Sequence, residues 1–208
     1  MRTTRTLSIL AASLLIAVSA AADTRTLDGS QSAAGLALLS LETGVGDVVI
    51  TGADSDRVEY KVILKPRRGG IFSSLRSAQR EVDTATLKAE VVGRELRLKV
   101  RSDDDDRRFE ERWTIRVPSR LAVELEAGVG DVDIRGLEAG LDVEIGVGDA
   151  SIDVAGGDVT VEVGVGEVSV RGPVQAYGRA ECEGGVGDAR LRVRGQRIDS
   201  EGLVGHSA

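Results

Sequence analysis

Acidic side chains recur in this chain at one fixed place, directly after a glycine-rich phrase. The phrase reads GVGD or GVGE, and its five acids are Asp47, Asp131, Asp149, Glu167 and Asp188. From Gly128 onward the phrases begin 18, 18 and 21 residues apart. Because repeats of this length indicate stacked structural units, the acids are expected to form a column.

Such a column allows two kinds of chemistry. Carboxylates stacked ~4.8 Å apart repel each other by about 1 kcal/mol per neighbouring pair in water, and a row of calcium ions would offset this. The five acids are therefore weak cation candidates, although the phrase departs from the G-G-x-G-x-D motif of calcium-binding repeats. Alternatively, each carboxylate accepts a backbone N–H within its own turn, as Asp commonly does. We favour the turn role and expect no metal and no cofactor, with calcium as the alternative.

The residues around the phrase predict the elements that hold it. Three columns are apolar in all five copies: Val48, Val132, Ala150, Val168 and Ala189; Ile50, Ile134, Ile152, Val170 and Leu191; Leu41, Leu125, Val143, Val161 and Cys182. Polar residues alternate with them, which indicates strands with one buried face. We predict an all-β fold, a β-solenoid or β-helix of about five short two-stranded coils. An antiparallel sandwich also fits turns every ~9 residues, but it does not explain identical turns at every second strand.

Residues 53–117 interrupt the repeat, and we expect them to form an inserted antiparallel hairpin cap. Alternating residues predict strands near 58–64, 87–92, 95–100 and 109–117, with Gly93-Arg94 as a two-residue hairpin. Ser73 or Ser74 is expected to cap a short helix through Arg80. Trp113 is expected in the core of the cap. Together with this insertion, residues 36–208 are expected to form a single β-solenoid domain.

The N-terminus predicts export. Residues 1–22 combine Arg2 and Arg5 with an apolar run and a final Ala-Ala-Ala, as in a secretory signal peptide. Residues 23–35 are small and polar and are expected to be loose. Cleavage would change the formal net charge from −7 to −9, which argues against nucleic acid as a partner. No other apolar run is long enough to cross a membrane.

Charged residues outside the acidic column fit either a specific role or a simple solvated surface. An outward column reads Thr51, Arg135, Asp153, Arg171 and Arg192, and Asp153 between two arginines predicts a cross-strand ion ladder. Arginines at 190, 192, 194 and 197 make the last unit basic, which suits anionic polysaccharide, lipid phosphate or, as we favour, a solvated face. The run Asp103–Asp106 lacks the EF-hand spacing and is interpreted as a hairpin tip.

Catalytic residues are not evident, and we expect no enzyme. His206 is the sole histidine and lies near the C-terminus, so it does not suit a catalytic triad. Cys182 occupies an inward apolar column and is interpreted as a small buried hydrophobe rather than a nucleophile. The expected turns are too short to build a substrate cleft.

The GVGD and GVGE units, the WTIRVP segment that precedes them and the expected signal peptide resemble a bacterial family of putative adhesins of unknown function. The chain is similar to the head domains of putative autotransporter adhesins over most of residues 36–205. This resemblance implies a β-solenoid and a weaker association with envelope stress signalling. It implies no catalytic residues.

The sequence therefore predicts a non-enzymatic exported scaffold or adhesin-like binding protein, periplasmic or at the cell surface. Its expected partner is an envelope protein or a glycan, and stacking of sheet edges would allow oligomers. Two alternatives stay open: an envelope-stress sensor or regulatory partner that uses its sheet edges, and a calcium-stabilised repeat protein.

Overall fold

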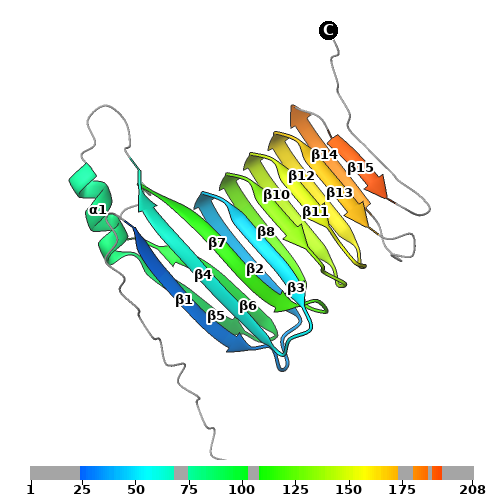
Figure 1. Cartoon of the computed structure of the whole chain (residues 1–208), viewed down its shortest axis with the longest axis horizontal. Coiled ribbons are helices and arrows are strands. Elements are labelled where there is room, and N and C mark those ends of the chain that lie inside the picture. Colours follow the sequence, from blue (N-terminus) through cyan, green and yellow to red (C-terminus); the bar gives the residue numbers. More distant parts are fainter. Residues whose placement is uncertain (1–23, 68–74, 103–107, 173–179, 187–188, 194–208) are drawn as a thin grey trace, which may run out of the picture.

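The structure is a computed structural model, and it describes residues 24–67, 75–102, 108–172, 180–186 and 189–193. In these residues there are fifteen strands and one helix, α1, which spans Leu75–Thr84. The strands form two mixed sheets whose buried faces share one hydrophobic core (Figure 1). The all-β prediction is thus confirmed.

One sheet has eight strands, and most of them carry the segments that follow the glycine phrases. In spatial order they are β1 (Arg25–Ser32), β4 (Arg57–Pro66), β7 (Phe109–Pro118), β3 (Val48–Ala53), β9 (Val132–Arg135), β11 (Ala150–Asp153), β13 (Val168–Gly172) and β15 (Ala189–Val193).

The other sheet has seven strands, and most of them lead into the glycine phrases. In spatial order they are β14 (Ala180–Val186), β12 (Val159–Val165), β10 (Leu141–Val147), β8 (Ala122–Val129), β2 (Leu38–Val45), β6 (Glu95–Arg101) and β5 (Thr86–Val92).

From β8 onward the chain alternates between the two sheets, and each strand pairs in parallel with the equivalent strand of the next unit. Val123 lies opposite Leu141, which lies opposite Val159, so the register follows the 18-residue repeat. The longer final spacing places Val159 opposite Ala180. The antiparallel sandwich is therefore wrong for the repeated part. Antiparallel pairs occur among the described strands only at β1–β4, β4–β7 and β5–β6.

The two glycines of each phrase permit these units to stack. A Cβ built on Gly146 would lie 2.5 Å from the carbonyl oxygen of Gly128 in the preceding unit. A Cβ on Gly148 would lie 2.0 Å from the Gly130 oxygen, and Gly148 also has a φ of +148°. Only glycine tolerates both that conformation and that backbone approach. The bend in each unit therefore depends on these positions.

The insertion lies beside the first unit, but it is not simply the antiparallel cap that the sequence predicts, because β6 and β7 pair in parallel with β2 and β3 and so continue the stack. Strands β2 and β8 pair directly, as do β3 and β9, although the insertion separates them along the chain. The inserted strands β6 and β7 lie on the other side of β2 and β3. The hairpin at Gly93-Arg94 is confirmed, since Val92 pairs with Glu95 and Gly93 has a φ of +63°.

The N-terminal expectation was wrong, because residues 25–32 form strand β1 on the edge of the eight-stranded sheet instead of a loose segment. The guanidinium of Arg25 donates through Nη1 to the carbonyl oxygens of Val82 and Ala85 at 3.0 and 2.8 Å. These contacts satisfy carbonyls at the C-terminal end of α1. Residues 26–32 are mostly small and polar, so their sequence lacks the alternating apolar pattern that would have predicted an edge strand.

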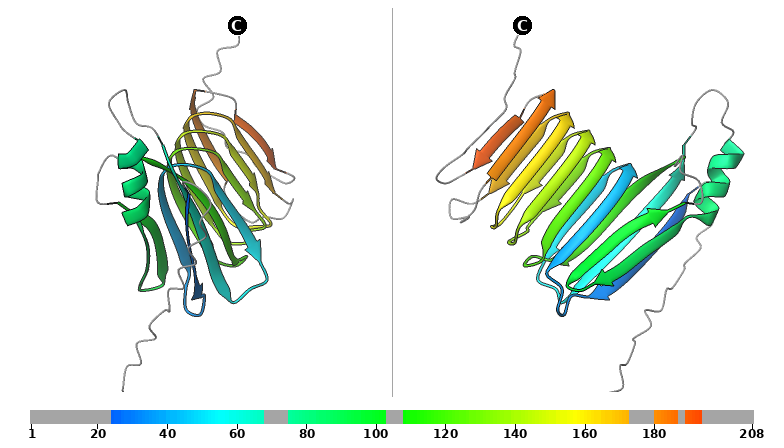
Figure 2. Two further views of the ribbon diagram at one scale, coloured as in Figure 1. Left: turned by 60° about the vertical axis from the view of Figure 1, so that its left-hand side comes forward. Right: turned by 180° about the vertical axis from the view of Figure 1, so that it is seen from behind.

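Helix α1 covers the end of the molecule remote from β14 and β15 (Figure 2). It continues four residues beyond the predicted Arg80, to Thr84. The proposed caps Ser73 and Ser74 lie outside the described residues. Glu81 is buried and accepts the backbone N–H of Arg108 at 2.9 Å, which ties the helix to the segment before β7.

Candidate functional site

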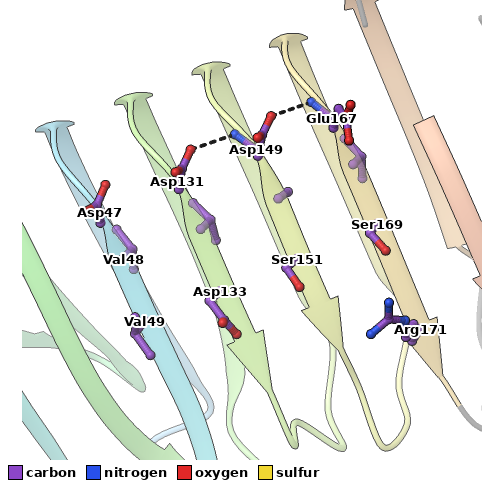
Figure 3. Close-up of a pocket in the computed structure, with 13 residues that line it drawn as sticks. Asp47, Val48, Val49, Asp131, Asp133, Asp149, Ser151, Glu167, Ser169 and Arg171 are labelled. Atoms are coloured by element: carbon purple, nitrogen blue, oxygen red, sulfur yellow. Dashed lines mark hydrogen bonds between the residues drawn. The ribbon is translucent and has the colours of Figure 1, made fainter. Parts of the chain in front are cut away.

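The structure brings four of the five predicted acids into one row on the eight-stranded sheet. They lie just before β3, β9, β11 and β13, at the corner where the chain leaves the glycine turn (Figure 3). Parallel pairing without a shift aligns them, because the residue after each acid pairs with its equivalent in the next unit. Asp188 lies outside the described residues.

Each carboxylate in the middle of the row bonds to the next unit instead of its own turn. Asp131 Oδ1 accepts the backbone N–H of Asp149 at 3.1 Å, and Asp149 Oδ1 accepts that of Glu167 at 2.8 Å (Figure 3). The expected bond within a single turn is thus corrected: stacking places the amide of the following unit nearer to the carboxylate. The acids therefore link units along the stack.

At the first position of the row the surroundings differ. Asp47 Oδ2 lies 3.7 Å from Arg112 Nε of β7, and both side chains are more than half exposed. An exposed pair of this kind contributes little to stability. Strand β7 belongs to the insertion, so the row ends where the repeated units meet the inserted strands.

Beside the acids runs a groove of about 540 Å³ across the outer face of β3, β9, β11 and β13. Its lining includes a second column of side chains that the register aligns: Val49, Asp133, Ser151 and Ser169. Counting this column, the groove has five carboxylates and one guanidinium, that of Arg171. A groove with this balance favours cationic or hydroxyl-bearing ligands over anions.

The predicted ion ladder was only half right. The register places Asp153 between Arg135 and Arg171, as expected. However, Arg135 pairs with Asp133, two residues earlier in its own strand. Within the described part of the chain Asp153 has an ion pair with neither arginine. For Arg192 the structure describes the backbone of β15 alone.

The groove contains acids, but their arrangement is linear. Among the described residues, no group of three or more His, Cys, Asp or Glu side chains could hold a metal ion. Two of the carboxylates already accept backbone amides. The calcium interpretation therefore remains a proposal without a preformed cage in the described residues.

Two features of the structure were not predicted. The valine inside three of the phrases is nearly half exposed: Val129, Val147 and Val165 are 45, 46 and 45 % exposed and lie in register beside the acids. An identical valine in every turn was the signal in the sequence. This apolar column borders the acidic row at the same corner.

The second unpredicted feature is a buried polar cluster at the junction of β2 and β7. Glu111 is 1 % exposed, and its Oε2 accepts Trp113 Nε1–H at 2.8 Å and the hydroxyl of Thr43 at 3.1 Å. The alternation of β7 indicates this placement, because Glu111 shares the parity of Phe109 and Trp113. Trp113 itself is fully buried, as expected.

Several other candidates fall outside what the structure describes: residues 1–22, the run Asp103–Asp106, Arg194, Arg197 and His206. The Cys182 backbone pairs with Val161 in β14, as the column predicts, and its side chain is not described. Among the described residues, no helix has both the length and the apolar character needed to cross a membrane.

Taken together, the parallel units and the acidic row define an all-β repeat domain with one charged outer face. The chain belongs to the family described as the N-terminal domain of toast_rack, DUF2154, which matches residues 22–171. This match spans the inserted strands and all units through β13, so it covers every described residue of the groove.

The fold also resembles solved structures. A putative cell adhesion protein from Clostridium sporogenes is 17% identical with a TM-score of 0.57, over 82% of this chain and 100% of that one. Putative adhesins from Bacteroides fragilis and Parabacteroides merdae are 12% and 10% identical, with TM-scores of 0.32 and 0.29; each covers 84% of this chain and 95% of its own. At this identity the first likeness supports the fold alone. No curated protein matches the chain.

Proposed function

We propose that the chain is a non-enzymatic, exported, adhesin-like binding protein of the bacterial envelope. In this proposal the repeated units form a β-solenoid of five coils, and the groove on its outer face binds an extended ligand. The observation that carries the proposal is the groove itself, which crosses four strands in register and presents from each an acid and a second outward side chain. Equivalent sites ~4.8 Å apart suit a ligand that also repeats along its length.

The lining determines the ligand chemistry that we propose. Carboxylates accept hydrogen bonds, and the hydroxyls of Ser151 and Ser169 both donate and accept. Sugar hydroxyls and amino groups supply matching donors, whereas phosphate groups would be repelled by the carboxylates. We therefore propose a glycan of neutral or amino sugars, bound weakly at each unit and strengthened by repetition along the row.

The same lining supports a binding role over catalysis. The groove residues include no histidine, cysteine or lysine, so carboxylates and serine hydroxyls are the only common bases and nucleophiles in this part of the described chain. Two of its acids are engaged by backbone amides. A periplasmic or cell-surface location fits such a protein, and export rests on the expected signal peptide.

Binding of the purified chain to envelope glycan fractions tests the proposal. Ser151→Lys places a cation in the middle of the groove and leaves both hydrogen bonds of the acidic row in place. We expect it to weaken glycan binding about tenfold or more. Thr160→Lys makes the same charge change on β12 of the opposite sheet and should leave binding unchanged.

Two results would overturn this proposal: no glycan fraction binds, or both variants bind as well as the original chain. Specific retention of a membrane protein in place of glycan would favour the alternative role as an envelope-stress sensor.

A further inference from the structure

Strand β5 leaves part of the core-facing side of its sheet uncovered. It is the last strand of the seven-stranded sheet and pairs with β6 alone among the described strands (Figure 2). Its residues Ala89 and Val91 lie opposite the buried Leu98 and Leu96 and so face the core side. Nevertheless Ala89 is exposed and Val91 is 49 % exposed. An apolar edge of this kind is a place where another strand can add.

The hairpin geometry shows which backbone groups of β5 are free. A two-residue loop joins the strands, so the closing pair Val92 and Glu95 exchanges both backbone hydrogen bonds. Hydrogen-bonded pairs alternate with non-bonded pairs along an antiparallel ladder. The backbone N–H and C=O groups of residues 86, 88, 90 and 92 therefore bond to β6. The groups of Leu87, Ala89 and Val91 therefore point to the open edge. The carbonyl of Arg94 supports this alternation. It accepts the backbone N–H of Ala37, on the side of β6 that faces β2, at 2.8 Å.

We propose that the chain forms a twofold-symmetric dimer in which β5 pairs antiparallel with β5 of a second copy, centred on Ala89. In this register Leu87 lies opposite the second copy's residue 91, and Ala89 lies opposite its own equivalent. Each residue whose backbone N–H and C=O point to the open edge then lies opposite another residue of that kind in the second copy. The three pairs form six backbone hydrogen bonds. Apolar Val91 is covered by Leu87 on the core side.

Charge selects this register over its neighbours. Lys88 and Glu90 pair with each other within the strand, at 2.6 Å. Centred on Ala89, the dimer places each Lys88 opposite Glu90 of the second copy, at a non-hydrogen-bonded position where side chains lie close. Centring on residue 88 would oppose two lysines, and centring on residue 90 would oppose two glutamates. The strand is thus complementary to itself in one symmetric register.

This dimer goes beyond the proposed function and does not depend on it. The groove lies over β3 to β13, whereas β5 lies at the end of the molecule that α1 covers (Figure 1). Pairing through β5 would leave both grooves open.

Sedimentation equilibrium of the purified full-length chain, from micromolar to millimolar concentration, tests the dimer. We expect a concentration-dependent dimer for the original sequence. Lys88→Glu and Glu90→Lys should each weaken it about tenfold or more, because like charges then face each other. Mixing the two variants should restore association as a heterodimer, and the double variant should dimerise again. Lys61→Glu, at an exposed position of β4, is the matched control and should have no effect.

Ala89→Pro provides a second variant that keeps the fold. The N–H that it removes points to the open edge and not to β6, so thermal unfolding should change little while the dimer is lost. A chain that sediments as a monomer throughout would overturn the proposal. So would a dimer that survives both single charge reversals, or a mixture of the two variants that associates no better than each alone.

Discussion

Glu111 stabilises the junction between the insertion and the first repeat through its buried carboxylate. It joins Thr43 of β2 to Trp113 of β7 through one oxygen. Removing a buried acceptor leaves its donors unpaired, which costs about 1–3 kcal/mol for each. The position was accessible from sequence, since strict alternation in β7 puts Glu111 on the apolar face. The contact with Thr43 could not be predicted from the sequence, because Thr43 lies in another strand.

We expect Glu111→Leu to lower the free energy of unfolding by about 3 kcal/mol, because two donors lose their acceptor. Glu111→Gln keeps an acceptor oxygen and should cost about 1 kcal/mol. Denaturant unfolding followed by fluorescence measures both, and Trp113, the sole tryptophan, reports from the cluster itself. Equal losses in the two variants would show that packing and not hydrogen bonding governs this site.

Tyr60 gives the fold a dependence on alkaline pH. Burial raises the pKa of Tyr60 above its ordinary 10.0. The unfolded chain therefore releases this proton at a lower pH than the folded chain does. The stability linked to Tyr60 is complete below about pH 10 and is lost as the pH rises through the folded pKa.

Tyr60→Phe retains the ring that packs against Gly29 and removes the proton. We expect its thermal midpoint to fall less steeply than that of the original chain above about pH 10. Lysine deprotonation affects both proteins alike, so the difference between the two curves isolates Tyr60. Parallel curves across this range would contradict the prediction.

At the scale of the elements, the glycine turn determines how closely two units approach. We expect Gly148→Ala to destabilise the fold by about 3 kcal/mol or more, because its Cβ would meet the Gly130 oxygen at 2.0 Å. Gly35→Ala is the control, since Gly35 also has positive φ but no atom lies within 4 Å of the added Cβ. It should cost about 1–2 kcal/mol, the strain of the conformation alone. Urea denaturation would compare them, and similar losses would show that backbone contact between units matters little.

The acidic row yields a prediction about metal. Asp131 and Asp149 already accept amides of the following units, and this offsets part of their mutual repulsion. We therefore expect the same thermal midpoint in EDTA and in millimolar calcium. A rise of several degrees with calcium, lost in Asp149→Asn, would support the calcium-stabilised alternative instead.

These elements also show how far sequence alone could reach. The repeat spacing and the apolar columns predicted the strands, their buried faces and the alignment of the acids. They could not identify the amide that each acid accepts, because that depends on the offset between stacked turns. The partner of Arg135 was missed for a similar reason: a rotamer toward Asp133 in its own strand competes with Asp153 in the next.

For the whole molecule, the position of the insertion was the part that sequence could not provide. The shared apolar columns predict that β2 pairs with β8 across the insertion. Residues 53–117 contain no copy of the phrase, so nothing in them indicates that β6 and β7 pair in parallel with β2 and β3. The result is a molecule with two different ends: inserted strands and α1 at one, and the last repeated units at the other (Figure 1).

This asymmetry predicts unequal cooperativity along the stack. Val132 of β9 and Val168 of β13 occupy the same apolar column, and each is 2 % exposed. β9 lies between β3 and β11 near the insertion, whereas among the described strands β13 has β15 alone beyond it. In stacks of repeats each unit depends mainly on its neighbours, so a defect near an end can unfold that end alone.

We therefore expect Val132→Ala to shift the whole unfolding transition by about 2 kcal/mol, with circular dichroism and Trp113 fluorescence changing together. Val168→Ala should separate the two signals, because the terminal units lose strand structure before the distant Trp113 is exposed. Hydrogen exchange should then show faster exchange in β12 and β13 and unchanged protection in β7. Coincident transitions in both variants would mean that the stack and the inserted strands unfold as one cooperative unit, and that the two ends differ in shape but not in stability.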